Sequence, residues 1–123
     1  MAIKNALRLT AKKLFDGGAL DTLYSEKVKD GRIYCIQQVA WEIDVATSGG
    51  NTRCRLYIEG HGYKHYISEQ DGPTAGTLYE YKIPLWLIPG ERLALDIDNT
   101  GTSTTAEMHL TGYWIKFEEG IVT

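Results

Sequence analysis

The chain has 123 residues and a formal net charge of -3, with 43% hydrophobic and 24% charged residues. These values fit one globular domain with a real core, and they exclude a disordered or collagen-like chain. The longest apolar run, Leu85 to Ile88, is too short to cross a membrane, and we see no secretion signal in the first fifteen residues.

Charge is distributed unevenly. Residues 1–68 carry ten Lys and Arg against seven Asp and Glu, whereas residues 69–123 carry three against nine. A basic front and an acidic rear favour contact between neighbouring subunits, because complementary potentials promote docking. A solvated terminal segment without a partner is the alternative. Nucleic-acid binding is disfavoured because the overall charge is negative.

The first fifteen residues contain four cations and no acid. Leu7 and Leu9 alternate as in a strand, whereas Ile3, Leu7 and Leu14 could line a helix. We favour an extended arm or an edge strand, so residues 1–15 are expected to form an N-terminal arm on a single β-sandwich domain of residues 16–123. The cations are candidate partner-binding residues: Lys4, Arg8, Lys12 and Lys13.

Strands are predicted almost throughout the rest of the chain. Residues 21–28 form a moderate strand, and a long run with a period of two follows over residues 33–45. Odd positions of that run, beginning with Ile33 and Cys35, are predicted to form its apolar face. A Gly- and Asn-rich turn is expected over residues 47–51.

The middle of the chain continues this pattern. Residues 52–60 are predicted to be a strand that enters a tight turn at residues 60–62 and returns as a strand over residues 63–70. A polar loop spans residues 68–76. Residues 77–83 then alternate tyrosine and isoleucine against charged residues, which indicates another strand.

The last third contains a proline-bounded segment and two further strands. Prolines 84 and 89 bracket a short apolar segment, which is expected to be a crossing segment or an edge strand because proline cannot donate a ladder hydrogen bond. Residues 92–98 are predicted to point Asp96 and Asp98 outward. The final strand, residues 104–117, changes the parity of its apolar face at Gly112, which predicts a β-bulge there.

Seven or eight short strands with Gly- and Asn-rich turns indicate an all-β antiparallel sandwich or barrel. No helical pattern interleaves them, which excludes a doubly wound parallel sheet. A jelly-roll-like sandwich of two sheets fits the length and strand number best. An immunoglobulin-like sandwich is the alternative, although Trp41 lies between cysteines only 19 residues apart, unlike the spacing of that fold.

The two cysteines, Cys35 and Cys54, lie on different predicted strands. If those strands pair as a hairpin, Cys54 lies opposite Ile43, and a disulfide would need a different pairing. Both cysteines occupy apolar faces, which favours buried free thiols and fits a reducing cytoplasm. The sequence has no CxxC motif, and the HxxxH spacing of His61 and His65 falls around a predicted turn and strand, where it does not place both side chains on one helix face, so no metal site is predicted.

No group of residues predicts catalysis. His61, His65 and His109 are expected at the surface or in structural hydrogen bonds. Residues 96–101 have the alternating acids of a calcium loop but lack the final glutamate of an EF-hand, so a solvated strand end is favoured. Nucleophile-elbow, phosphate-loop and dinucleotide motifs do not occur. We therefore expect no enzyme, no metal and no cofactor.

Tyrosine is concentrated in the middle of the chain. Tyrosines exposed on one sheet would form a sugar-stacking platform or a protein contact patch, because the ring is apolar and its hydroxyl can stay hydrated. The alternative places about half of them in the core of the sandwich. The candidate partner-binding residues from this region are Tyr63, Tyr66, Tyr79, Tyr81 and Trp86.

Three segments of the chain resemble the small β-sandwich virion proteins of tailed bacteriophages: residues 30–44, 52–70 and 83–117. The resemblance covers about residues 20–117 and lies in turns and core positions. It implies a jelly roll or a related sandwich, and it brings no catalytic residues with it. The motifs that carry it are Pro89-Gly90-Glu91-Arg92-Leu93 followed by Asn99, and Leu110-Thr111-Gly112-Tyr113-Trp114.

The resemblance also implies a structural role in the virion. The most specific expectation is a capsid decoration protein that stabilises the head by binding the major capsid protein or other virion proteins as a homo-oligomer, with a trimer favoured. Assembly in the host cytoplasm is expected, with no contact to nucleic acid or membrane. The alternatives are a neck, tail or receptor-binding component, and a carbohydrate-binding module in which Tyr79, Tyr81 and Trp86 stack on sugars.

Overall fold

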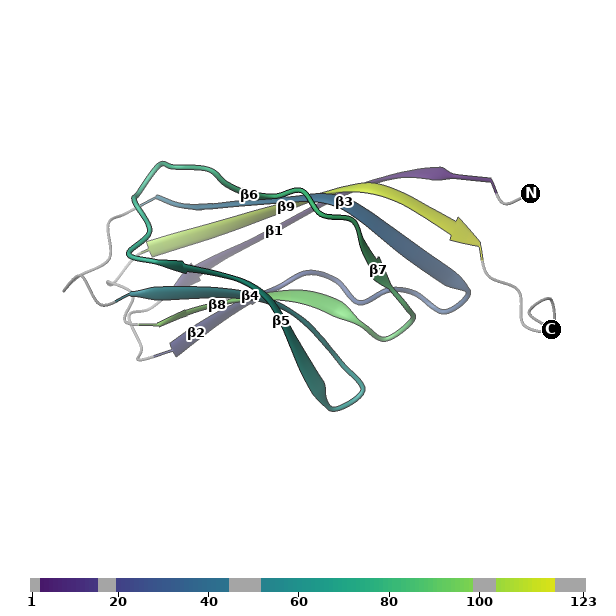
Figure 1. Cartoon of the computed structure of the whole chain (residues 1–123), viewed down its shortest axis with the longest axis horizontal. Coiled ribbons are helices and arrows are strands. Elements are labelled where there is room, and N and C mark those ends of the chain that lie inside the picture. Colours follow the sequence, from purple (N-terminus) through teal and green to yellow (C-terminus); the bar gives the residue numbers. More distant parts are fainter. Residues whose placement is uncertain (1–2, 16–19, 45–51, 99–103, 117–123) are drawn as a thin grey trace.

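The computed structural model describes residues 3–15, 20–44, 52–98 and 104–116. Within these residues two antiparallel β-sheets face each other (Figure 1). The five-stranded sheet contains β1 (Asn5–Phe15), β9 (Thr104–Lys116), β3 (Arg32–Ile43), β6 (Tyr79–Tyr81) and β7 (Leu85–Leu87). The four-stranded sheet contains β2 (Leu20–Tyr24), β8 (Arg92–Asp98), β4 (Arg53–Gly60) and β5 (Tyr63–Asp71).

The strand order is that of a jelly roll. The first sheet runs β1-β9-β3-β6, with β7 also on β3, and the second runs β2-β8-β4-β5. β6 and β7 pair with successive parts of the same edge of β3, so they act as one strand interrupted around Pro84. Counted this way, two four-stranded sheets hold eight strands, with the first strand paired to the last and the second to the next to last. The all-β, jelly-roll-like prediction is confirmed.

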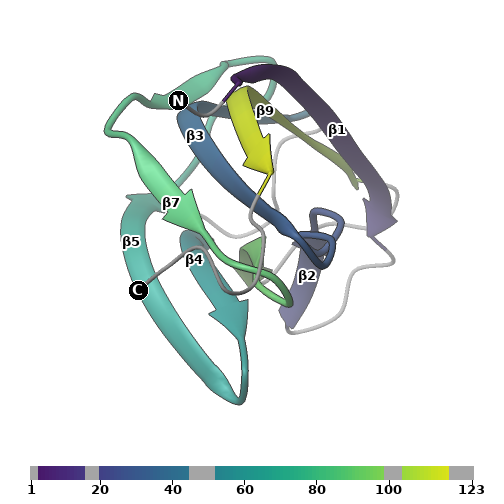
Figure 2. The same cartoon turned by 90° about the vertical axis from the view of Figure 1, so that its right-hand side faces the viewer.

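Figure 2 shows how the strands border the sandwich. β1 and β2 lie along one side, and β7 and β5 lie along the opposite side. The described residues contain no helix long and apolar enough to span a membrane.

The core lies between the two sheets and is built by alternate residues of the central strands. Burying one large aliphatic side chain stabilises the fold by about 1.5–3 kcal/mol relative to leaving it exposed, so these positions hold the layers together. The inward-facing set includes Phe15, Tyr34, Ile36, Val39, Ile43, Leu56, Leu93, Leu95, Ile97, Met108 and Leu110.

A bulge in β3 changes the expected faces of two strands. Ile36 pairs with Gly112 and Gln38 pairs with Thr111, which leaves Gln37 as the extra residue on β3. The sequence placed this irregularity at Gly112 on β9; the structure places the extra residue on the opposing strand. A Cβ at Gly112 would collide with the carbonyl oxygen of Cys35, so the bulge requires glycine there.

Because of this bulge, the predicted odd-numbered apolar face of β3 is wrong for its first half. Tyr34 and Ile36 point into the core before the bulge, while Ile33 and Cys35 point outward. The predicted parity switch of β9 is also wrong, because Trp114 continues on the same side as Met108 and Leu110. Tyr113 and Ile115 therefore lie on the outer face.

The N-terminal segment is an edge strand of the sandwich. All eleven residues of β1 pair with β9, from Asn5 opposite Trp114 to Phe15 opposite Thr104. Leu7 and Phe15 are buried in the core. Residues 5–15 therefore form an edge strand, which is one of the two expectations for this segment. They do not form a free arm, because their backbone is paired with β9.

The conditional hairpin between residues 33–45 and 52–60 does not form. β3 and β4 belong to different sheets, so Cys54 does not pair with Ile43. Both cysteines are buried and free, as predicted. The expected turns over residues 47–51 and 99–101 lie outside the described residues.

Candidate docking surfaces

The outer face of the five-stranded sheet changes from charged to apolar along its strands. At one end, the register aligns Glu107 of β9 with Glu42 of β3. At the other end, Cys35 of β3 lies between Trp86 of β7 and Tyr113 of β9. We call the apolar end the Trp86 patch; it consists of Ile33, Cys35, Trp86, Tyr113 and Ile115.

Trp86 is the most prominent side chain of the Trp86 patch. It is 54% exposed, which is unusual for the largest apolar side chain on a folded surface. The edge of one ring meets the face of the other at Trp86 and Tyr113, with centroids 6.2 Å apart. The Nζ of Lys4 lies 4.7 Å from the Tyr113 ring, so a cation borders the aromatic pair.

Cys35 lies beneath this aromatic pair. It is only 3% exposed although it points away from the core, because its cross-strand neighbours are Trp86 and Tyr113. A hydrogen bond to Cys35 and partial desolvation raise the pKa of the Tyr113 hydroxyl above its ordinary value.

A turn after β7 fixes the position of this edge strand. The buried carboxylate of Glu91 accepts hydrogen bonds from the backbone N–H of Ile88, at 2.8 Å, and from the Tyr63 hydroxyl. The Nε2 of His61 donates to the carbonyl of Pro89 at 2.9 Å. These contacts tie the β7–β8 turn to the tip of the β4–β5 hairpin.

Glycine is required at the closest approach in this junction. Gly90 has a φ of 88°, and a Cβ there would meet the His61 ring at 3.0 Å. The predicted tight turn at residues 60–62 is confirmed by positive φ values of 51° at His61 and 83° at Gly62. The Pro89–Leu93 motif noted in the sequence is thus a structural turn, with Glu91 as its anchor.

The four predicted basic residues all lie on β1 or just before it, but they do not form one cluster. Lys4, Arg8 and Lys12 follow the outer side of the sheet. Lys13 instead joins the two sheets: its Nζ lies 3.1 Å from Oδ1 of Asp21 on β2. Only Lys4 therefore contacts the Trp86 patch.

The predicted aromatic residues are also divided among different surfaces. Tyr79 and Tyr81 pack against the core, and Tyr79 stacks on Trp41 with centroids 4.6 Å apart. Tyr63 binds Glu91, and Tyr66 lies on the four-stranded sheet. The exposed sugar-stacking platform expected from Tyr79, Tyr81 and Trp86 is therefore absent.

Four members of the Trp86 patch are not predicted from the sequence: Ile33, Cys35, Tyr113 and Ile115. Their alternation was visible, but it was assigned to the inward face. The signal that identifies them is Gly112, because a glycine within a long strand marks a close approach of another backbone.

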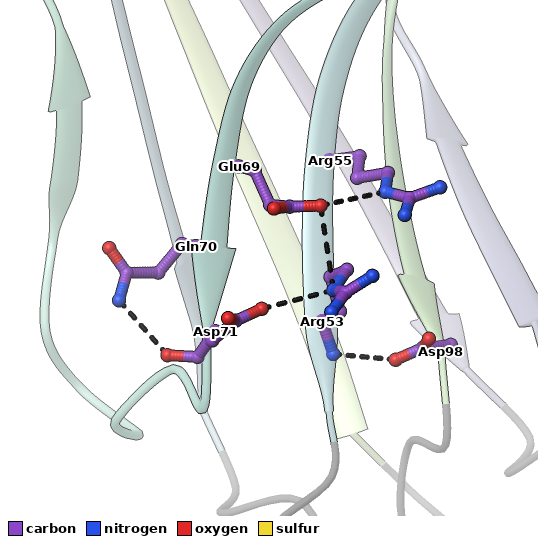
Figure 3. Close-up of polar contacts among 6 residues, drawn as sticks. All are labelled: Arg53, Arg55, Glu69, Gln70, Asp71 and Asp98. Atoms are coloured by element: carbon purple, nitrogen blue, oxygen red, sulfur yellow. Dashed lines mark hydrogen bonds and ion pairs between the residues drawn. The ribbon is translucent and has the colours of Figure 1, made fainter.

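The outer face of the four-stranded sheet is covered by charged side chains (Figure 3). Arg53 and Arg55 lie side by side on β4, between carboxylates of β5 and Asp98 of β8. The Nε of Arg55 donates to Glu69 at 2.9 Å, and the Nε of Arg53 donates to Asp71 at 3.1 Å. On the other side, the backbone N–H of Arg53 donates to Asp98 at 2.5 Å.

Asp96, expected to be a solvated strand-end acid, is 7% exposed. It points to the outer face as predicted, but its Oδ1 accepts hydrogen bonds from the Thr22 hydroxyl at 2.7 Å and the Tyr57 hydroxyl at 2.8 Å. Burial, followed by the hydrogen bond to Asp96, raises the pKa of Tyr57. The structural role of Asp96 is therefore to accept hydrogen bonds from two hydroxyls.

The described residues contain no group of three His, Cys, Asp or Glu side chains arranged to hold a metal ion. His109 instead shares a hydrogen bond with Thr10 at 3.1 Å, and its other ring nitrogen lies 3.3 Å from Glu107.

Neither a protein-family model nor a curated protein matches the chain. Among solved structures, it is similar to a chain in the acid-stable capsid structure of Helicobacter pylori bacteriophage KHP30, at 13% identity over 94% of this chain and 93% of that chain, with a TM-score of 0.63. This likeness over nearly the whole of both chains shows a shared fold.

Two further structural matches have lower TM-scores. A chain of the cyanophage Pam1 capsid asymmetric unit is 15% identical over 89% of this chain and 85% of that one, with a TM-score of 0.47. Modules of a Clostridium thermocellum endo-1,4-β-D-xylanase in complex with xylohexaose are 15% identical over 97% of this chain but only 27% of that one, with a TM-score of 0.44.

Proposed function

We propose that the protein is a non-enzymatic structural component of a tailed-phage virion that binds shell proteins. The observation that carries the proposal is the jelly-roll order of this chain together with its structural similarity, over nearly the full length of both chains, to a protein chain of a phage capsid structure. Capsid proteins are among the known users of this architecture. Capsid decoration is the specific role we favour within this class, because a compact sandwich with an exposed patch suits attachment to an assembled shell.

The Trp86 patch is the surface that we assign to shell binding. Exposed apolar area bordered by polar residues is typical of protein contacts, and Trp and Tyr dominate the energy of such contacts. Trp86 and Tyr113 are held on paired strands, so little side-chain freedom is lost on binding. Lys4 at the border favours a partner surface that carries acidic residues.

One other feature of the chain agrees with this role. The polar groups around Glu91 and Asp96 are engaged in structural hydrogen bonds. The prediction of a homo-oligomer, and of a trimer in particular, stays a prediction. Neck, tail and receptor-binding roles use the same kind of contact and are separated from decoration by where the protein lies in the particle.

Binding to assembled heads tests the proposal. Heads assembled from the major capsid protein of the phage that encodes this chain under the proposal would be incubated with the purified protein and sedimented. We expect co-sedimentation that saturates at a fixed ratio to capsid protein, and we expect Trp86→Ala to weaken binding about tenfold or more, as for a central aromatic contact.

The control is Leu14→Ala, which removes an exposed apolar side chain at the opposite end of the same sheet. This variant should bind heads as the wild-type protein does. Failure of the wild-type protein to sediment with heads, together with its absence from purified particles by mass spectrometry, would overturn the virion role. An equal loss of head binding in both variants would show that the Trp86 patch is not the surface that binds the shell.

A further inference from the structure

The outer face of the four-stranded sheet carries an ordered pattern of charge about a row of tyrosines. The register places Tyr66 of β5 beside Tyr57 of β4, and Tyr57 beside Ala94 of β8. On one side of this row lies a second row with the charge order plus, minus, plus. On the other side lies a third row with the order minus, plus, minus. The two charged rows are Lys64–Glu59–Arg92 and Glu69–Arg55–Asp96.

A bulge in β5 is needed to create this pattern. Leu56 pairs with Ser68 and Tyr57 pairs with Tyr66, so Ile67 is the extra residue on β5. The bulge turns Glu69 outward, onto the same face as Tyr66, and Ile67 packs against the core. Strict alternation would have placed the carboxylate on the inner side.

This pattern is complementary to itself under a two-fold rotation. The rotation axis lies above the tyrosine row, parallel to the sheet and perpendicular to its strands. It places each strand opposite the same strand of the second copy, and the two strands run in opposite directions. Lys64 then faces Glu69 of the second copy, and Glu59 faces its Arg55. The two copies of Tyr66 meet near the axis. Isologous contacts between identical chains require this kind of self-complementary surface.

We propose that two copies of this chain associate through the outer faces of their four-stranded sheets, about a two-fold axis over Tyr66. The exposed side chains of the hairpin would make the first contacts: Tyr66 is 51% exposed, and Arg55 and Glu69 have side-chain exposures of 42% and 48%. A hollow of about 190 Å³ lined by Lys64, Tyr66 and Arg55 gives room for interdigitating side chains.

Within one copy, the same charges are already paired across strands. Arg92 donates to Glu59 at 2.6 Å and Arg55 donates to Glu69 at 2.9 Å, as Figure 3 shows for the latter pair. The second copy would place a further opposite charge against each of these side chains. No side chain of the two charged rows would then face a residue of the same charge. Face-to-face packing with strands inclined by about 30° is the ordinary geometry for twisted sheets.

Two charge reversals test the two-fold pairing directly. In Lys64→Glu, positions 64 and 69 are both acidic, and in Glu69→Lys both are basic. Each variant alone would place like charges opposite each other across the axis. A one-to-one mixture would restore an opposite pair at both contacts. We expect each variant alone to raise the dimer dissociation constant about tenfold or more, and the mixture to recover heterodimers.

Sedimentation velocity over a range of protein concentrations measures the dimer, and native mass spectrometry of size-tagged variants measures the heterodimer. Arg8→Glu is the control, because it makes the same change in charge on the other sheet and should leave dimerisation intact. Circular dichroism melts verify that each variant is folded. If a reversal unfolds the chain, Tyr66→Asp provides the test, because it places like charges beside the axis.

A wild-type protein that stays monomeric at all concentrations would overturn the contact. So would single variants that dimerise as well as the wild type, or a mixture that forms no heterodimer. The result is separable from the virion role, because head binding is assigned to the opposite sheet: a monomer that still binds heads would contradict the two-fold contact alone.

Discussion

The Tyr57 hydroxyl donates a hydrogen bond to Oδ1 of Asp96 at 2.8 Å, although both side chains belong to the outward-facing side of their strands. Tyr57 is 1% exposed and Asp96 is 7% exposed. The neighbouring Tyr66 ring lies 5.1 Å from the Tyr57 ring, and Lys64 Nζ lies 5.3 Å from it. The outer layer of this sheet is therefore packed closely enough to bury polar groups.

Removing this hydrogen bond should destabilise the protein at neutral pH. Tyr57→Phe keeps the ring but leaves Asp96 with one fewer donor, so the free energy of unfolding should fall by about 1–3 kcal/mol. Urea denaturation followed by tryptophan fluorescence measures the change. The control is Tyr66→Phe, whose hydroxyl belongs to an exposed side chain, and which should change stability by less than about 0.5 kcal/mol. Equal decreases in the free energy of unfolding for the two variants would contradict a stabilising hydrogen bond between Tyr57 and Asp96.

Alkaline pH should weaken the fold. Burial raises the pKa of Cys54 from 9.0 to about 12, and burial with the Asp96 hydrogen bond raises that of Tyr57 above its ordinary value of 10.0. The folded state therefore keeps protons that the unfolded state loses, so stability is fully present below about pH 9 and decreases as pH rises through the raised pKa values.

The free energy of unfolding, measured in urea from pH 8 upward, checks this dependence. Tyr57→Phe should make the decline above pH 10.0 shallower, because one of the two groups no longer titrates. A decline of the same slope in the variant would show that Tyr57 does not contribute to it.

Gly112 should be intolerant of any side chain. A Cβ at this position would collide with the carbonyl of Cys35, and the bulge around Gln37 prevents the strands from separating without loss of pairing. Gly112→Ala should lower the free energy of unfolding by about 2 kcal/mol or more. Thr111→Ala, at the adjacent exposed position, is the matched control and should have little effect. Thermal melts that do not differ between them would contradict the close approach.

The two cysteines should differ in how they become reactive. Cys54 is 1% exposed within the core, and its raised pKa keeps the thiol protonated. Cys35 is covered by Trp86 and Tyr113 on the outer face. In Trp86→Ala, a thiol reagent should modify Cys35 in the folded protein while Cys54 stays unmodified.

Peptide mass spectrometry after brief labelling identifies the modified cysteine, and Cys35→Ser combined with Trp86→Ala should abolish the labelling. Rapid labelling of Cys54 in the folded double variant would indicate that the substitution opens the core rather than the surface.

Much of the fold follows from patterns that the sequence displays openly. Alternation predicted the strands of residues 53–60, 63–71 and 92–98 to within a residue or two, because the strand period of two leaves a clear signal where one face is buried. The same reasoning predicted the turn at His61 and the free cysteines.

The Trp86 patch was less accessible to sequence reasoning. One extra residue in a strand moves the side chains that follow it to the opposite face of the sheet. Gln37 is the extra residue here, and glutamine is not a residue type that indicates a bulge. As a result, Ile33 and Tyr113 were assigned inward. Tyr79 is a candidate surface residue in the sequence but packs against the core in the structure, because its ring stacks on Trp41 of another strand. Contacts of this kind depend on the pairing of strands, which local alternation does not specify.

The pairing of β1 with β9 also determines how the chain must fold. Asn5 pairs with Trp114, which is synthesised 109 residues later, and β2 likewise pairs with the later strand β8. The edge of β1 therefore has no partner strand until β9 has been synthesised. Such long-range closure is typical of all-β domains, which fold in milliseconds to seconds, and it leaves the hydrogen-bonding edge of β1 without its partner until β9 is available.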